Sequence, residues 1–189
     1  MTIVTKRKQN LVIVSLLFAL LLVLVFLLVS LPMAKDDSAK EETAQNFSSL
    51  IDTTDKKIVN IAVKNELGEY EVRIDEKDGK QVYTLDGLDA NETAQSSASV
   101  LVESLTNLRP TQVIDEDDLD LSMYGLNSVE AQLTVSFDNG EKTILSLGAD
   151  APLSQGSYAK VEGDAKVYLI ALGDKEIFLN EKSFYQEVE

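Results

Sequence analysis

VEAQLTVSFDNGEKTILSL, residues 129–147, decides the fold class of this sequence. Its first half alternates apolar and polar residues without a break, with apolar residues at Val129, Ala131, Leu133, Val135 and Phe137. The turn Asp138-Asn139-Gly140 leads into a second apolar segment, 142–147, in the pattern of a β-hairpin. This alternation is typical of antiparallel sheets with one buried face, and it argues against a parallel nucleotide-binding fold.

Further strands are predicted on both sides of this hairpin. Three lie upstream and form an antiparallel meander with glycine-containing turns: 57–64, 69–75 and 81–85. The first of them is expected to place three apolar side chains on one face: Val59, Ile61 and Val63. Two more strands lie downstream and pair around Gly163-Asp164: 156–162 and 166–171.

Two helices complete the pattern. Between residues 90 and 108, apolar residues recur at helical steps: Ala94, Ala98, Leu101, Leu105 and Leu108. Asp89 is expected to cap this helix with Glu92 as its capping-box partner, and Pro110 ends it. Asp174 is expected to cap a terminal helix with Ile177, Phe178 and Phe184 as its apolar residues. The order β-β-β-α-β-β-β-β-α predicts an α+β fold, in which a mostly antiparallel sheet packs on two helices.

A separate segment precedes this domain. Leu11 to Leu31 is a stretch of 21 residues whose polar members are two serines, long enough as a helix to cross a bilayer. Three cations stand directly before it: Lys6, Arg7 and Lys8. The positive-inside rule then predicts a cytoplasmic segment 1–10, a transmembrane anchor 11–31, a polar stalk 32–56 and an extracytoplasmic domain 57–189. The alternatives are a cleaved signal peptide, although its apolar core is usually shorter, and a buried core helix of a soluble protein.

Composition limits the chemistry that this chain can perform. Its 189 residues include no histidine, no cysteine and no tryptophan, which excludes an imidazole base, a thiol nucleophile and an ordinary zinc site. The net charge is −15, and residues 35–189 carry 14 Lys and Arg against all 32 acidic residues. Nucleic acid is therefore not an expected partner. A Ser–Lys hydrolase around Ser122-Met123 and a glycan-cleaving carboxylate pair are weaker hypotheses, so we expect neither enzymatic activity nor a cofactor.

One acidic run deserves a separate interpretation, because hard oxygen ligands suit calcium. It consists of Asp115, Glu116, Asp117, Asp118 and Asp120. The run departs from an EF-hand loop, since Met123 replaces the required glycine and Val129 replaces the bidentate glutamate. A solvated acidic loop is the favoured interpretation, and a calcium site remains the alternative.

A family resemblance rests on the segment around Tyr124-Gly125-Leu126. An acidic stretch precedes this triplet, and a strand ending in Leu147-Gly148 and a Val167-Tyr168 strand follow it. Residues 57–172 resemble a bacterial family of unknown function whose members pair an N-terminal anchor with an extracytoplasmic α+β domain. Some members resemble auxiliary components of gliding-motility-type ABC transporters. Two departures are Tyr83, where the family often has tryptophan, and Asn127-Ser128, where it usually has proline.

The resemblance implies no catalytic residues, and the triplet itself is interpreted as structural. Gly125 can supply a positive φ where the chain turns into the long strand, with Tyr124 and Leu126 packing on opposite sides of that corner. The expected function is a single-pass, membrane-anchored extracytoplasmic scaffold. It would contact lipid through residues 11–31 and act with a membrane-protein partner, as an accessory component of an ABC transporter or another envelope assembly. The alternative is an extracytoplasmic sensor domain that binds calcium or another ligand.

Overall fold

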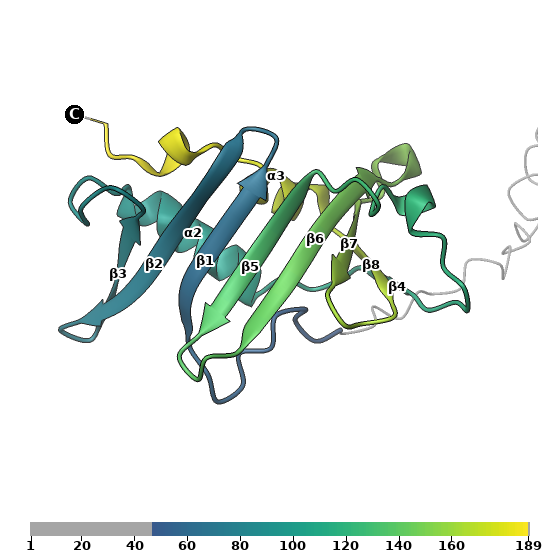
Figure 1. Cartoon of the computed structure of the whole chain (residues 1–189), viewed down its shortest axis with the longest axis horizontal. Coiled ribbons are helices and arrows are strands. Elements are labelled where there is room, and N and C mark those ends of the chain that lie inside the picture. Colours follow the sequence, from purple (N-terminus) through teal and green to yellow (C-terminus); the bar gives the residue numbers. More distant parts are fainter. Residues whose placement is uncertain (1–46, 189) are drawn as a thin grey trace, which may run out of the picture. The chain divides into compact units, whose positions relative to one another are not determined.

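A single antiparallel sheet dominates the computed structural model, which describes residues 47–188. Its strand order is β3-β2-β1-β5-β6-β7-β8-β4, with every neighbouring pair antiparallel (Figure 1). The strands are β1 (Ile58–Asn65), β2 (Gly68–Lys77), β3 (Lys80–Leu85), β4 (Gln112–Ile114), β5 (Ala131–Phe137), β6 (Lys142–Asp150), β7 (Ser157–Val161) and β8 (Val167–Ile170). The helices are α2 (Gln95–Thr106) and α3 (Leu172–Phe178), with short 3-10 turns η1 (Leu121–Tyr124), η2 (Pro152–Ser154) and η3 (Lys182–Tyr185). The predicted α+β class, mostly antiparallel with two helices, is confirmed.

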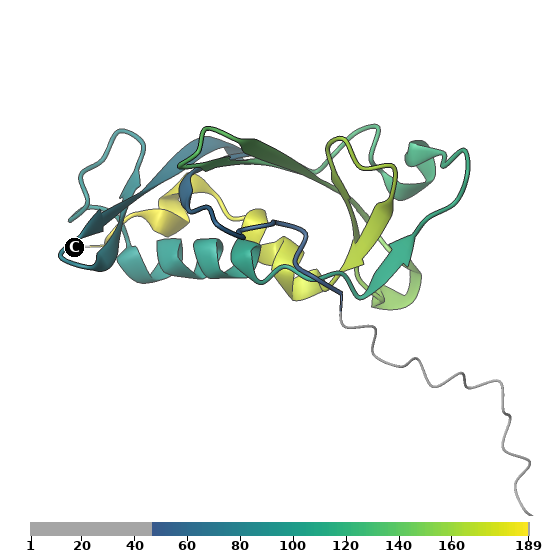
Figure 2. The same ribbon diagram turned by 90° about the horizontal axis from the view of Figure 1, so that it is seen from below.

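Both helices lie on the same face of the sheet, which curves over them (Figure 2). The core forms between this inner face and the apolar side of α2. The apolar residues predicted for the helix are all buried, with an exposed fraction of 9 % or less: Ala94, Ala98, Leu101, Leu105 and Leu108. The alternating residues of β5 are buried as well, from Ala131 to Phe137, whereas Val129 precedes the strand and is exposed. Burial of these side chains provides the main driving force for folding.

The predicted membrane anchor lies outside the described residues, as do its flanking cations Lys6, Arg7 and Lys8. Between residues 47 and 188, no helix has the length and apolar character needed to cross a membrane. The last part of the predicted stalk is described, and it lies against the domain. Ile51 is fully buried, and the N–H of Leu50 donates to the carbonyl oxygen of Leu108 at 2.8 Å. Residues 47–56 therefore take part in the folded unit.

The predicted element order lacked one strand. Residues 112–114 form β4, which pairs with β8 at the end of the sheet, whereas the sequence pattern placed them in a linker. Three residues are too few to show a period of two, so only the tertiary pairing reveals this strand. In β1, a register irregularity between Ile58 and Asn60 puts Ile58 in the core in place of the expected Val59.

The helix ends also differ from the expected ones. α2 begins after Ala94, and the predicted capping pair forms a separate turn upstream, where the N–H of Asp89 donates to Glu92 Oε2 at 2.8 Å. Near the C-terminus, Phe184 is 51 % exposed and the fully buried aromatic residue is its neighbour Tyr185. A 3-10 turn in place of a continuing helix rotates the chain and exchanges the two side chains.

Side chains block one edge of the sheet. On β3, the N–H of Tyr83 donates to Gln95 Oε1 at 2.9 Å, and Gln95 Nε2 donates to the carbonyl oxygen of Tyr83 at 2.7 Å. The N–H of Leu85 donates to Thr93 Oγ1 at 3.0 Å. Backbone groups of an edge strand otherwise form a template for another chain. The segment that leads into α2 thus prevents strand addition at β3.

We predict that Gln95→Ala destabilises the protein by about 1–3 kcal/mol, because it leaves the Tyr83 backbone groups without partners. The same change should cause concentration-dependent association by exposing the β3 edge. Urea unfolding and light scattering measure the two effects. Ser96→Ala changes an exposed residue of the same helix and serves as control. Equal stability of the two variants would show that Gln95 does not block the edge.

Candidate functional site

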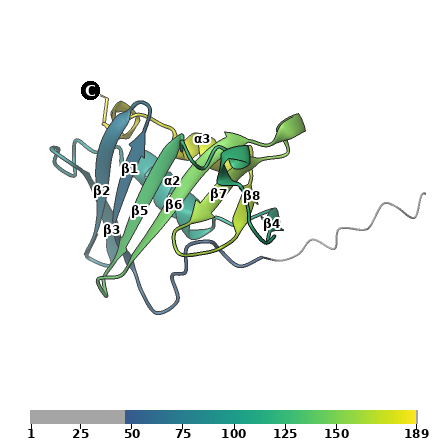
Figure 3. The same cartoon turned by 45° about the vertical axis from the view of Figure 1, so that its right-hand side comes forward.

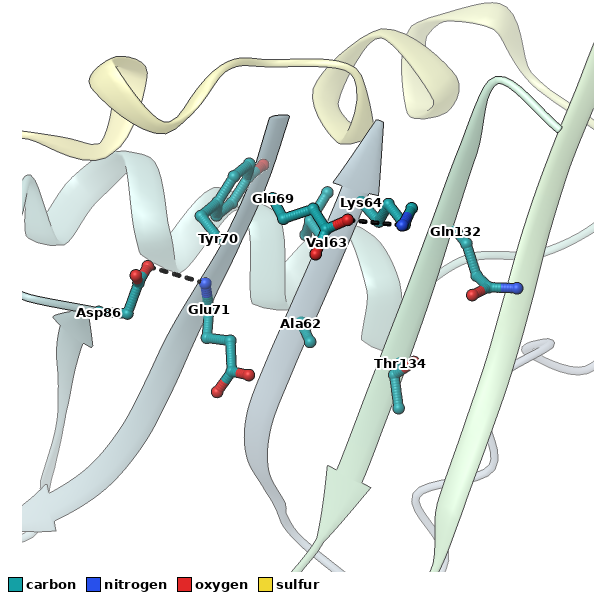
Figure 4. Close-up of a pocket in the computed structure, with 9 residues that line it drawn as sticks. All are labelled: Ala62, Val63, Lys64, Glu69, Tyr70, Glu71, Asp86, Gln132 and Thr134. Carbon is teal, nitrogen blue, oxygen red and sulfur yellow. Dashed lines mark hydrogen bonds and ion pairs between the residues drawn. The ribbon is translucent and has the colours of Figure 1, made fainter. Parts of the chain in front are cut away.

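The outer face of the sheet, opposite the helices, contains a hollow of about 420 Å³ over β1, β2 and β5 (Figure 4). Two small side chains lie next to each other at its centre, since Ala62 of β1 pairs with Thr134 of β5, and the longer Glu71 of β2 pairs with Ala62 on the other side. The lining residues are Ala62, Val63, Lys64, Glu69, Tyr70, Glu71, Asp86, Gln132 and Thr134. Small residues between longer ones leave a depression that a protruding side chain of another molecule can enter.

Two polar contacts lie along the walls of this hollow. Lys64 Nζ lies 2.5 Å from Glu69 Oε1, and the N–H of Glu71 donates to Asp86 Oδ1 at 3.0 Å (Figure 4). Asp86 also pairs with Lys182 at 2.9 Å. Burial raises the pKa of Asp86, but the Glu71 N–H and the Lys182 ammonium outweigh this effect and hold the pKa below its usual range. Asp86 is therefore a charged, structurally engaged carboxylate.

The chemical character of the hollow is that of a binding surface. Its polar groups are carboxylates, one ion-paired lysine, an amide and a hydroxyl. The side chain of Tyr70 is 3 % exposed and belongs to the core, where its ring packs on Tyr185 with a centroid distance of 5.2 Å, so the groups that a partner would meet are the other polar side chains of the lining. Such groups can bind a partner by hydrogen bonds and charge, as in a polar protein interface.

The triplet Tyr124-Gly125-Leu126 forms a tight corner against β6. Gly125 ends η1 with a φ of 68°, and a Cβ atom there would lie 2.6 Å from the Ala149 nitrogen. A Cβ atom on Gly148 would lie 2.2 Å from the carbonyl oxygen of Tyr124. The two glycines let two backbones approach within a distance that no side chain permits. The Tyr124 ring packs edge-on against Tyr158, with centroids 4.9 Å apart.

A nearly buried lysine lies next to this corner. Lys175, on α3, has a side chain that is 5 % exposed, and its Nζ contacts three oxygens: Gly148 O at 3.0 Å, Asp150 Oδ1 at 2.7 Å and Glu130 Oε2 at 2.7 Å. Ser157 Oγ donates to the same Asp150 oxygen at 2.7 Å. Burial lowers the pKa of Lys175, but the two carboxylates outweigh it, so the pKa is raised above the ordinary value. Each ammonium hydrogen has a partner, and the cluster joins α3 to β6.

Lys175 was not among the residues predicted to form a site. The sequence contains a weak indication that this lysine is buried, because Lys175 lies three residues before the buried Phe178 and therefore on the inner side of α3. A lysine on an apolar helical side requires acidic partners, and 32 acidic residues make those partners impossible to choose from the sequence.

The acidic run 115–120 is partly used for local structure. Asp115 pairs with Lys166 at 3.4 Å, and Asp120 caps η1 by accepting from the N–H and hydroxyl of Ser122 at 3.0 and 2.7 Å. Across residues 47–188, no set of three or more acidic side chains is placed to hold a metal ion.

These features define an α+β domain with a polar outer sheet face and a glycine-lined corner. Residues 84–187 match the family described as a domain of unknown function, DUF4340, and the match covers more than half of the chain. The chain belongs to the DUF4340 family. No curated protein and no solved structure matches the chain. The matched region contains the Tyr124-Gly125-Leu126 corner and Lys175, whereas β1 and β2, which contribute most of the hollow, precede it.

We predict that Gly148→Ala destabilises the protein by about 1–3 kcal/mol or more, because its Cβ must displace the Tyr124 backbone. Gly173→Ala is the matched control, since no atom lies within 4 Å of a Cβ at that position of α3. This control should be neutral or slightly stabilising, by up to about 1 kcal/mol. Thermal unfolding of both variants tests the close approach. A Gly148→Ala protein as stable as the control would contradict it.

A second prediction concerns pH. The pKa of Asp150 is lowered, first by its hydrogen bond with Lys175 and then by that with Ser157. Its contribution to stability is thus present above the ordinary value of 3.8 and is lost as the pH falls through the lowered pKa. Lys175 affects stability in the opposite direction. Its contribution to stability is fully present below its ordinary pKa of 10.5 and is lost as the pH rises through the raised pKa of the folded protein.

Asp150→Asn keeps the shape and the acceptor oxygen but removes the charge. We expect it to lower the free energy of unfolding by about 1 kcal/mol at neutral pH, a value reduced for solvent screening of the exposed carboxylate. The difference from the wild type should vanish in acid. Urea unfolding from about pH 2 to pH 7 measures it. Asp117→Asn, in the exposed loop, is the control. A pH-independent difference for Asp150→Asn would show that the charge pair with Lys175 does not stabilise the fold.

Proposed function

We propose that this protein is a single-pass, membrane-anchored interaction domain of the bacterial cell envelope. In this proposal residues 11–31 cross the membrane, residues 1–10 are cytoplasmic, and the α+β domain lies outside the cytoplasm. The domain acts by contact with a membrane protein, as an accessory component of an ABC transporter or a related assembly. This last assignment rests on the family resemblance.

The observation that carries the proposal is the pairing of two unlike parts in one chain. The stretch 11–31 is apolar all round and follows three cations, as expected of a membrane anchor with a cytoplasmic N-terminus. The described domain is acidic, with 27 Asp and Glu against 12 Lys and Arg in residues 47–188. An acidic domain is repelled by anionic lipid headgroups, which favours contacts with protein over contacts with the bilayer surface.

The surface chemistry of the domain supports a binding role. The hollow on the outer face has walls held by ion pairs and hydrogen bonds, and a whole-chain composition without histidine or cysteine leaves few groups for acid–base or nucleophilic catalysis. Polar walls around small residues are suited to recognition of a partner.

Protease accessibility tests the orientation. The full chain with a C-terminal epitope tag is expressed in bacterial cells. Protease is then added to cells in which the inner membrane is intact and the protease can reach the outer face of that membrane. We expect loss of the tag and survival of a membrane-bound N-terminal fragment. A Lys6→Glu, Arg7→Glu, Lys8→Glu variant is the control, because reversal of the flanking charge should reduce the fraction in this orientation. A tag that is cut only after the cytoplasm is opened would refute the proposed topology.

Co-purification tests the partner. The tagged full chain, extracted in mild detergent from its native cells, should bring down an ABC transporter membrane subunit in constant ratio. A chain recovered alone under several mild detergents would refute the proposed accessory role.

A further inference from the structure

The two edges of the sheet differ in how they end. The backbone of β3 is blocked by Gln95 and Thr93, as described above. At the other end, β4 pairs with β8 on its inner side, and within residues 47–188 no segment hydrogen-bonds to its outer side. Figures 1 and 3 show β4 as the last strand of the sheet, beside β8. The outer backbone groups of β4 thus have no strand partner among residues 47–188, and such groups can pair with an extended segment of another protein.

A groove of about 410 Å³ lies beside the open edge. Val113 of β4, Val161 of β7 and Tyr168 of β8 contribute strand residues to its lining, and Phe47, Leu50 and Pro110 contribute loop residues. Four polar residues line it as well: Ser48, Ser49, Asp164 and Lys166. Val113, Val161 and Leu50 are partly buried and pack against the core. The apolar part of the groove is therefore continuous with the hydrophobic core, polar side chains line the rest, and the groove has the size of a site for one or two side chains.

Charge surrounds one end of this groove. The acidic run begins directly after β4, and Asp115 pairs with Lys166 at 3.4 Å. Glu116, Asp117 and Asp118 are exposed, and among the described residues no cation lies within ion-pair distance of them. A molecule that binds along β4 meets these three carboxylates. Complementarity then requires Lys or Arg in the bound segment.

We propose that β4 and this groove bind an extended segment of a partner protein by strand addition, with an apolar side chain in the groove and Lys or Arg residues beside 116–118. The backbone of the segment pairs with the outer side of β4, which gives affinity without sequence preference. The groove and the acidic residues give specificity. This inference rests on the proposed interaction function and names the surface that performs it.

A second copy of this chain fits the same surface less well. The described residues of each copy carry 27 acidic and 12 basic side chains, so two domains that approach along β4 repel each other. A basic segment of another protein is attracted by the same charge. The occupant is therefore a partner of opposite charge.

Hydrogen–deuterium exchange locates the site on the full chain in detergent micelles. The probe is the peptide KVKVKVK, which alternates cations with apolar side chains. We expect slower exchange in residues 110–116 on addition of the peptide and no change in residues 80–86 of the blocked edge. The same sequence with serine in place of valine, KSKSKSK, should bind at least about tenfold more weakly, a difference of about 1.4 kcal/mol.

Two variants separate the contributions. Glu116→Gln, Asp117→Asn, Asp118→Asn together should weaken KVKVKVK binding about tenfold at low salt. Val113→Thr keeps the shape but places a hydroxyl in the apolar part of the groove, and it should weaken binding several-fold, whereas Val82→Thr on β3 should not. Protection outside 110–116, equal binding of KSKSKSK, or equal effects of the two valine variants would overturn the proposal.

The outcome is distinguishable from failure of the proposed function. If a membrane protein co-purifies with the wild type and equally with Val113→Thr and the triple variant, the interaction function stands and the β4 site is wrong. If the peptide binds as expected but no membrane protein co-purifies, the accessory role is wrong. A dimer by light scattering, with protection of 110–116 in the absence of peptide, would assign β4 to a second copy and overturn the proposed occupant.

Discussion

The fold depends on the contact between the inner face of the sheet and the apolar side of α2. A chain without cysteine has no disulfide to close its loops, so this contact must provide most of the stability. Leu101 and Leu105 of the helix are fully buried, and so are Leu133 and Val135 at the middle of the sheet. The remaining architecture is arranged around this layer. The outer face needs no apolar cover, and it is therefore available for polar side chains.

The sequence predicted the elements that carry this contact, because their patterns are long. Seven residues of β5 alternate without interruption, and α2 repeats its apolar residues over three turns. Short or irregular features were not predicted. Three residues cannot display a period, so β4 was placed in a linker, and the register irregularity in β1 exchanged Val59 for Ile58. The predicted capping pair also did not locate the start of the helix, since Asp89 and Glu92 form their hydrogen bond in a turn that precedes it.

The candidate sites were less accessible to sequence reasoning than the fold. Their residues come together from distant strands, and pairing of that kind leaves no local signal. The Lys175 cluster joins α3 to carboxylates 25 and 45 residues earlier in the chain. The corner at Tyr124 was recognisable as a sequence motif. The need for glycine there comes from the close approach of Gly148 to the Tyr124 backbone, which the sequence alone does not reveal. The outer-face hollow arises from a register in which Ala62 lies between Glu71 and Thr134.

The unequal edges of the sheet connect this structure to function more directly than any single residue does. A closed barrel would have no edge, whereas an open sheet must pair, cover or charge each of its two ends. β3 is sealed by the side chains of Gln95 and Thr93, which are held by the segment leading into α2. β4 is short, and an acidic run follows it at once. Charge next to an edge repels a second acidic copy while it attracts a basic strand, so the same residues that limit self-association also select the partner.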